Sequence, residues 1–179
     1  MSNIIILTGS MRNNGNTSLL AQSFAEGAAK HNSVEIISAA ECSVAPCTGC
    51  NSCFTREGGR CFRDDDMTWI YEKLRTADTV VIASPVYFYG ISAQLKAVVD
   101  RLHTPMRNTF RIKKLGLLLV GAAELPNLFD PILMQYQMVL DFFGLGSIGE
   151  VLVRGVKDIG DIKDSDALRE AYLLGESIV

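Results

Sequence analysis

Five short apolar runs recur along the chain. The first, Ile4 to Leu7, shows no alternation of polar and apolar positions and consists mostly of β-branched residues. This pattern is typical of a strand that is buried on both faces of a parallel sheet. Similar runs follow at intervals, so the sequence predicts strands over residues 3–8, 34–37, 79–83, 114–120 and about 150–154.

The segments between these runs carry apolar residues at helical spacing. The first helical pattern begins at Thr17, and Asn16 is its expected N-cap. Three aspartates at 64–66 precede another helical pattern, where we expect them to cap a helix rather than to bind a metal. The predicted helices cover about 17–28, 67–75, 95–102, 132–143 and 167–174.

Strands and helices therefore alternate along the whole chain. Alternation of this kind indicates a parallel sheet with right-handed crossovers and helices on both faces. We expect a three-layer doubly wound α/β fold in one domain spanning residues 1–179, with a cysteine-rich insertion at about 42–64. Ligands of such folds bind outside the carboxyl ends of the strands. The loops after the first, third and fourth strands are therefore the candidate site.

Composition and charge exclude several classes of protein. Of 179 residues, 48% are hydrophobic and 21% charged, which is enough apolar surface to offset the entropy of folding. The net charge is −3 and no basic stripe is present, so we expect neither nucleic acid nor a membrane as a partner. The apolar run at residues 4–7 is too short for a signal peptide, and we expect a cytoplasmic protein.

The loop between the first strand and the first helix, residues 9–18, has the composition of an anion site. It contains two glycines, six hydroxyl or amide side chains and Arg12, all next to a predicted helix N-terminus. It lacks the spacing of a P-loop and of a dinucleotide fingerprint, so a terminal monophosphate fits it better than a triphosphate. The alternative is a polar turn that only caps the helix.

The loop after the third strand, residues 84–92, is apolar and aromatic. Pro85 stiffens it, and its backbone can hydrogen-bond the polar edge of a flat heteroaromatic ring while Tyr87, Phe88 or Tyr89 lines the face of that ring. Alternatively, these aromatic side chains pack a corner of the fold or a subunit interface.

Four of the five cysteines lie in one short segment. The spacing of Cys47, Cys50 and Cys53 matches that of bacterial ferredoxins, and Cys61 follows within reach of the same loop. Four interpretations remain open: a 4Fe–4S cluster, a zinc site of four thiolates, a set of reactive redox thiols, or a structural loop without metal. Cys42 lies outside this spacing and is expected to be a small buried residue.

Three motifs together resemble the NAD(P)H-dependent FMN reductase and iron-sulfur flavoprotein family, which has a flavodoxin-like fold with five parallel strands in the order 2-1-3-4-5. They are the loop at 9–17, the Cys-x-Gly-Cys-x-x-Cys segment leading into Asp65-Asp66-Met67, and Ser84-Pro85-Val86-Tyr87 followed by Lys96-x-x-x-Asp100-Arg101.

The resemblance implies roles for particular residues. The FMN phosphate would be held by Ser10, Arg12, Asn14, Asn16, Thr17 and Ser18. The isoalloxazine would be held by Pro85, Val86, Tyr87, Phe88, Tyr89 and Gly90, with Gly121 and Ala122 completing the pocket. The cysteine segment resembles the compact cluster motif of iron-sulfur flavoproteins. The family also implies a homodimer or homotetramer. Asp100 and Arg101 are expected to form local ion pairs or to support the aromatic loop.

The sequence is thus interpreted as that of an FMN-dependent enzyme that takes electrons from NAD(P)H and passes them to a quinone, a flavin or another acceptor. Because the cofactor carries the chemistry, we assign no catalytic acid or base. Alternatives are an iron-sulfur flavoprotein that receives electrons from a ferredoxin-like partner, a non-catalytic carrier of flavodoxin type, and a zinc-stabilised binding module without flavin.

Overall fold

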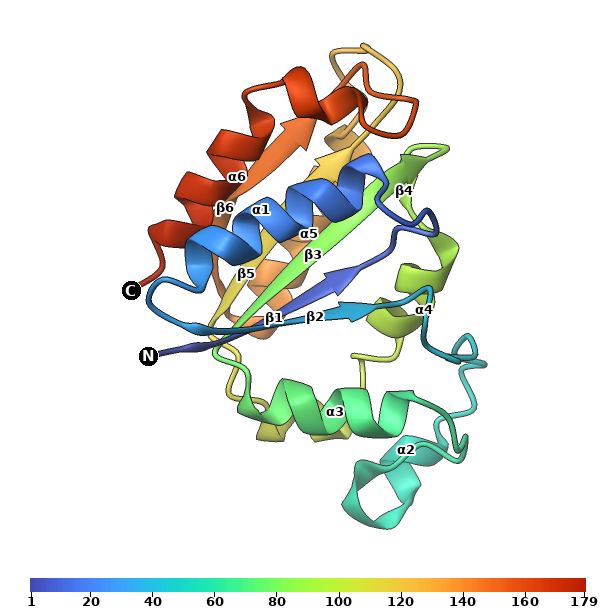
Figure 1. Cartoon of the computed structure of the whole chain (residues 1–179). Helices are drawn as coiled ribbons and strands as arrows, with labels where there is room; N and C mark the ends of the chain where they lie inside the picture. The colour runs from blue at the N-terminus through green and yellow to red at the C-terminus, as the bar shows by residue number, and fades with distance from the viewer.

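The computed structural model describes residues 1–179 and contains a parallel sheet at its centre (Figure 1). Its five parallel strands lie in the order β2-β1-β3-β5-β6, which is the predicted order when only these five strands are counted. They are β1 (Asn3–Thr8), β2 (Ser33–Ser38), β3 (Thr79–Tyr87), β5 (Lys114–Val120) and β6 (Gly146–Val153).

A sixth, very short strand was not predicted. β4 (Gly90–Ile91) turns back from β3 and pairs with it antiparallel, so that Val86 faces Ile91 and Tyr87 faces Gly90. Two residues are too few to show an alternating pattern, and β3 itself continues four residues beyond its predicted end. The aromatic loop is therefore the tip of a hairpin that extends from the central strand (Figure 1).

Helices cover both faces of the sheet (Figure 1). On one face lie α1 (Asn16–Ala28) and α6 (Ala167–Glu176), and on the other lie α3 (Met67–Thr76), α4 (Ala93–Asp100) and α5 (Asp130–Phe143). Short helical turns occupy the connections: α2 (Ser52–Thr55), η1 (Glu57–Gly59), η2 (Pro105–Thr109) and η3 (Asp161–Asp164). None of the helices is long and apolar enough to reach across a bilayer.

The two faces of the sheet explain the continuous apolar runs. Along β1, Ile4 and Ile6 pack in the core beneath α1 and α6, whereas Ile5 and Leu7 pack in the core beneath α3, α4 and α5. All four side chains are completely or almost completely buried. A strand between two helical layers has no side that faces water, so neither of its two alternating sets of side chains is polar.

Two predicted boundaries were wrong. β6 begins at Gly146 rather than near residue 150. The first residues of this strand include two glycines and a serine, so the sequence shows no apolar run there, and a register shift interrupts the pairing with β5. The N-cap of α1 is Gly15, and Asn16 is the first residue of the helix. The side chain of Asn16 does not cap the helix because it binds a distant loop instead.

Candidate functional site

Three loops meet at the carboxyl edge of the sheet, because β1, β3 and β5 are neighbouring parallel strands (Figure 1). The N–H of Gly9, which opens the first loop, donates to the carbonyl of Ala83 in β3 at 2.8 Å. The third loop is fixed in the same way, since the N–H of Gly121 donates to the carbonyl of Val153 in β6 at 2.8 Å. The sequence-predicted site residues are thus brought to one edge by hydrogen bonds that continue the sheet.

The start of α1 presents hydrogen-bond donors without acceptors. Gly15 has no side chain with which to cap the helix, and the N–H groups of Asn16, Thr17 and Ser18 have no acceptor within the chain. The first N–H groups of every helix lack an intrahelical partner, and together with the helix dipole they attract an anion. No carboxylate lies in the first turn of this helix. The position is therefore open to a phosphate.

The loop before α1 is closed by its own contacts. The Ser10 hydroxyl donates to the carbonyl of Arg12 at 3.1 Å, and the N–H of Gly15 donates to the same carbonyl at 3.1 Å. Asn14 adopts a left-handed conformation with φ of 54°, which asparagine tolerates better than most residues. Ser10 and Thr17 are buried, Ser18 is half-buried, and Arg12 and Asn14 are exposed.

Two of the residues predicted to hold the phosphate bind another loop with their side chains. Arg12 donates to the carbonyl of Lys157 at 2.8 Å. The amide of Asn16 donates to the carbonyl of Asp158 at 2.8 Å and accepts from the N–H of Gly160 at 3.0 Å. These contacts connect the loop after β6 to the loop at residues 9–18, which we call the phosphate loop. Because the side chain of Asn16 is used in this way, only its backbone N–H remains free to bind a ligand. No sequence signal pointed to this link.

The aromatic loop is a two-residue hairpin turn. Phe88 and Tyr89 both adopt left-handed conformations, with φ of 47° and 65°. Such turns favour asparagine and glycine, and a bulky side chain there is strained by about 1–3 kcal/mol. The Phe88 side chain is 98% exposed, and Tyr87 and Tyr89 are about half exposed. Strain and exposed aromatic surface at one position are typical of a ligand site.

Below the turn, serines hold the base of the hairpin. The Ser84 hydroxyl donates to the carbonyl of Pro85 at 2.8 Å and accepts from the N–H of Ser92 at 3.0 Å. Pro85 and Val86 lie half-buried between this base and the exposed turn that ends at Gly90. The hairpin is therefore anchored firmly to the sheet although its tip is exposed.

The third loop begins with buried Gly121 and exposed Ala122. Arg154 braces it by donating to the carbonyls of Leu125 at 3.1 Å and Pro126 at 2.9 Å, and its guanidinium lies 4.6 Å from the centre of the Phe129 ring. This loop is positioned by the arginine that directly follows the carboxyl end of β6, which the sequence pattern did not reveal.

The cysteine segment encloses a separate cavity of about 140 Å³. We refer to it as the cysteine pocket, because all four predicted ligands line it: Cys47, Cys50, Cys53 and Cys61. All are free thiols, and no three His, Cys, Asp or Glu side chains in the chain converge closely enough to share a single metal ion. Hydrogen bonds from Ser52 lower the pKa of the exposed Cys50 thiol, whereas burial raises the pKa of Cys53.

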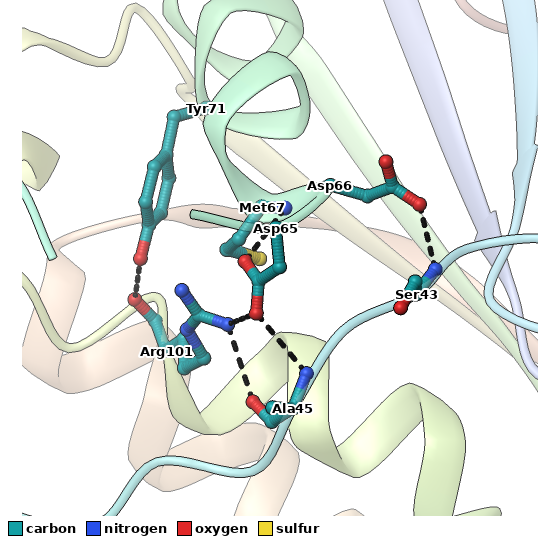
Figure 2. Close-up of polar contacts among 7 residues, drawn as sticks. All are labelled: Ser43, Ala45, Asp65, Asp66, Met67, Tyr71 and Arg101. Carbon is teal, nitrogen blue, oxygen red and sulfur yellow. Dashed lines mark hydrogen bonds and ion pairs between the residues drawn. The ribbon is translucent and has the colours of Figure 1, made fainter. Parts of the chain in front are cut away.

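A buried ion pair forms one wall of this region (Figure 2). Arg101, at the end of α4, donates through Nη1 to the Asp65 carboxylate at 2.5 Å and to the carbonyl of Ala45 at 3.2 Å. Asp65 also accepts from the N–H groups of Ala45 and Met67. The Tyr71 hydroxyl donates to the carbonyl of Arg101 at 2.7 Å. The pair thus fixes the chain two residues before Cys47.

This pair corrects two expectations. Asp65 contributes to the start of α3 as predicted, since it accepts from Met67, but its main partner is an arginine distant in the sequence. Asp100 and Arg101 were expected to form local ion pairs or to support the aromatic loop; Asp100 makes a local pair with Lys96, whereas Arg101 pairs with the distant Asp65. Sequence spacing identifies pairs on one helix, but it cannot identify a pair between a loop and a distant helix end.

Asp65 makes the stability of the fold depend on pH. Burial acts to raise the pKa of its carboxyl, but the hydrogen bond from Arg101 and the N–H of Ala45 outweigh burial and hold that pKa below its ordinary value of 3.8. A carboxyl with a depressed pKa contributes stability above its unfolded pKa, and this contribution is lost as the pH falls through the folded pKa.

We therefore expect the free energy of unfolding to fall as the pH drops below about 4. Urea denaturation between pH 2.5 and 7 measures this dependence for the native chain and for the Asp65→Asn variant. The variant lacks the titrating group, so its acid decline should be shallower. Equal slopes in both proteins would contradict the assigned role of the carboxylate.

The sequence pattern of the family described as NADPH-dependent FMN reductase matches residues 2–139. An iron-sulfur flavoprotein of Methanocaldococcus jannaschii is 40% identical over 124 residues, which cover 68% of this chain and 63% of the relative. The chain therefore spans less than two thirds of that relative's length.

Two further similarities cover nearly the whole chain. An iron-sulfur flavoprotein of Archaeoglobus fulgidus is 30% identical over 177 residues, which cover 96% of this chain and 76% of the relative. Among solved structures, the NAD(P)H:quinone oxidoreductase from Methanothermobacter marburgensis superimposes with a TM-score of 0.80 over 99% of both chains. Its sequence is only 16% identical, so this similarity establishes the flavodoxin-like fold alone.

Proposed function

Because the chain belongs to the NADPH-dependent FMN reductase family, we propose that it binds FMN and uses it to pass electrons from NAD(P)H to a small-molecule acceptor. The observation that carries the proposal is the open start of α1, where three N–H groups lack acceptors at the edge of the sheet onto which the aromatic hairpin also opens. A ligand that carries both a phosphate and an aromatic ring system matches these two features, since the phosphate suits the free N–H groups and the ring suits the aromatic hairpin.

The residues present suit FMN. The N–H groups of Asn16, Thr17 and Ser18 and the hydroxyls of Thr17 and Ser18 would hold the phosphate, with Ser10 and Asn14 shaping the loop. The segment from Pro85 to Gly90 would hold the ring, with Gly121 and Ala122 at its other side. Bound FMN supplies the capacity to accept a hydride or electrons, and the protein supplies orientation and access.

A small-molecule acceptor such as a quinone is favoured over a purely carrier role. The tip of the hairpin is exposed, so a flat acceptor can reach a ring bound beside it. A carrier of flavodoxin type needs a strongly acidic docking face, and a net charge of −3 over 179 residues is small for that purpose. We further propose a cytoplasmic homodimer or homotetramer, in which Phe88 would lie near a second subunit.

The cysteine pocket supports a second element of the proposal, a 4Fe–4S cluster. One zinc ion requires its sulfur ligands around a single point at about 2.3 Å, and no such convergence exists here. A 4Fe–4S cluster requires only one thiolate for each iron, so four thiols spread over the wall of one cavity suit it better. With a cluster present, the electron donor would be a ferredoxin-like protein.

Steady-state assays of the FMN-loaded protein test the proposed reaction. We expect NADH or NADPH to be oxidised when a soluble quinone is supplied, and oxidation to depend on added FMN. If neither nicotinamide is consumed but chemically reduced ferredoxin is oxidised, the electron donor in the proposal is wrong. If the bound flavin exchanges electrons with no small-molecule acceptor, the carrier alternative replaces the enzyme.

The strained hairpin gives a prediction with opposite effects on stability and binding. Replacing Phe88 with asparagine and Tyr89 with glycine supplies the residues that this turn prefers, so the free energy of unfolding of the flavin-free protein should rise by about 1 kcal/mol. Removing the two aromatic side chains should weaken FMN binding by about tenfold, since aromatic pairs contribute about 0.5–1.5 kcal/mol.

Urea denaturation and fluorescence titration with FMN measure the two effects separately. The single variants Phe88→Asn and Tyr89→Gly assign each effect to one position. A double variant that binds FMN as tightly as the native chain would show that these side chains do not contact the ring.

A further inference from the structure

Two of the three buried side-chain polar atoms without a hydrogen-bond partner belong to arginines that line the cysteine pocket. They are Nε of Arg63 and Nη2 of Arg101, and the third such atom is the hydroxyl oxygen of Ser92. Arg63 makes no hydrogen bond to any group of the chain, and Arg101 uses only Nη1. Two of the three buried side-chain polar atoms without a partner thus belong to residues that line this one pocket.

Unpaired donors of this kind need a physical explanation. A buried N–H group on a charged side chain that lacks an acceptor destabilises the fold, and such groups are rare in folded proteins. The side chain of Arg101 is 4% exposed, so water does not solvate it freely. Asp100 is the one carboxylate that lines the pocket, and it is paired with Lys96. The other polar side chains of the lining are those of Thr48, Asn51, Ser52, Tyr71, His103 and Thr104, and none of them accepts from Nε of Arg63 or Nη2 of Arg101. Cysteine thiolates that bind iron would be the anionic acceptors in this pocket.

Both arginines are held in place by other contacts. Asp65 and the carbonyl of Ala45 fix the guanidinium of Arg101, as Figure 2 shows. The guanidinium of Arg63 lies 5.3 Å from the centre of the Phe62 ring. The donor of Arg101 is therefore positioned before any partner arrives, which is the arrangement expected for a group that recognises a fixed anion.

We propose that Arg63 and Arg101 donate hydrogen bonds to the anionic iron-sulfur centre that the four cysteines hold, and that they raise its reduction potential. The inference rests on the cluster in the proposed function. Thiolate and sulfide ligands make such a centre negative, and reduction adds a further negative charge. Positive charge and hydrogen bonds to sulfur stabilise the reduced form more than the oxidised form.

Arg63→Gln is the primary variant, because Arg63 has no hydrogen-bond partner whose loss would disturb the fold. Arg60→Gln is the matched control, since Arg60 is exposed, lies in the same segment and does not line the pocket. The proteins are purified without oxygen, reconstituted with iron and sulfide, and assayed for iron, sulfide and FMN. The reduction potential of the cluster is then measured by a titration followed by electron paramagnetic resonance.

The equilibrium constant for cluster reduction should fall by about tenfold in Arg63→Gln relative to Arg60→Gln, a shift of about 59 mV for one electron. Arg63→Lys should recover most of the shift, because it restores the charge. Loss of iron from Arg63→Gln alone, with an unchanged melting temperature, would also support the inference. If the equilibrium constants for cluster reduction in Arg63→Gln and Arg60→Gln differ by less than twofold, the inference is overturned.

Arg101 requires a different design, because its removal leaves Asp65 buried without a partner. The comparison is therefore between Asp65→Asn and the double variant Asp65→Asn with Arg101→Gln. The double variant should have the lower potential, again by about tenfold in the equilibrium constant. Equal potentials would remove Arg101 from the inference. If the native chain takes up no iron, the cluster itself is wrong and the inference falls with it, whereas FMN binding is measured independently in the same samples.

Discussion

Replacing Ser18 with aspartate is expected to weaken FMN binding by about a hundredfold without destabilising the flavin-free protein. Ser18 lies in the first turn of α1, where a negative side chain interacts favourably with the helix dipole by about 0.3–1 kcal/mol. The same charge would repel the phosphate. Two unit charges about 4 Å apart repel by about 4 kcal/mol at an effective dielectric constant of about 20. Screening reduces this value, and about 3 kcal/mol corresponds to a hundredfold change in Kd.

Fluorescence titration with FMN and urea denaturation of the flavin-free protein measure the two quantities. Thr68→Asp is the matched control, because Thr68 is an exposed hydroxyl residue in the first turn of α3, outside the three loops of the site. It should leave FMN affinity unchanged. Ser18→Ala should lose only the contribution of one hydroxyl group. Native-like affinity in Ser18→Asp would mean that the phosphate does not bind at the start of α1.

Replacing Gly27 with alanine is expected to destabilise the fold by about 3 kcal/mol, the upper part of the usual range for overpacking. A Cβ on Gly27 would lie 2.0 Å from the carbonyl oxygen of Tyr172 and 2.8 Å from its carbonyl carbon. These are backbone atoms of α6, so the clash cannot be relieved by moving a flexible side chain. In turn, a Cβ on Gly175 would lie 2.2 Å from the carbonyl oxygen of Phe24.

Thermal and urea denaturation test this prediction. A loss of about 3 kcal/mol lowers Tm by about 6–12 °C in a chain of this size. Gly146→Ala is the control, because the nearest atom to its added Cβ is 3.8 Å away, an ordinary contact distance. A Gly27→Ala protein as stable as Gly146→Ala would show that α1 and α6 separate easily.

The close approach of α1 and α6 also matters for the site. The loop proposed to hold the phosphate, residues 9–18, leads into the N-terminus of α1. Asn16 in the first turn of α1 binds the carbonyl of Asp158 and the N–H of Gly160 in the connection that leads to α6. Helix packing at one end and the Asn16 contacts at the other therefore fix the direction of the three free N–H groups. The Gly27→Ala variant should bind FMN more weakly even where it remains folded.

Much of the fold could be predicted because its signals are local. Ile4 to Leu7 are apolar without alternation because β1 lies between two helical layers, and the helical spacing after Thr17 reflects one buried face of α1. The parallel direction of the strands and the edge that carries the loops follow from the alternation of strands and helices, whereas the order of the strands was implied by the resemblance to the family. The doubly wound α/β fold was correct for these reasons, and the flavodoxin-like strand order was correct because the resemblance to the family holds.

The details that the sequence did not reveal depend on contacts between distant residues. Asn16 could have capped α1, and only its position beside residues 157–162 directs its side chain elsewhere. The pairing of Asp65 with Arg101 has no periodic signature. Phe88 and Tyr89 are poor residues for a tight hairpin turn, so their local preference argued against the conformation that they adopt.

Whether the chain binds FMN is decided by the absorption spectrum of the protein after incubation with FMN and removal of free flavin by gel filtration. We expect flavin bands at about one FMN per chain, and their loss in Ser18→Asp but not in Thr68→Asp. A broad iron-sulfur shoulder with about four irons per chain would support the cluster in addition. A native chain that is folded and yet retains no flavin after repeated incubation would contradict the account.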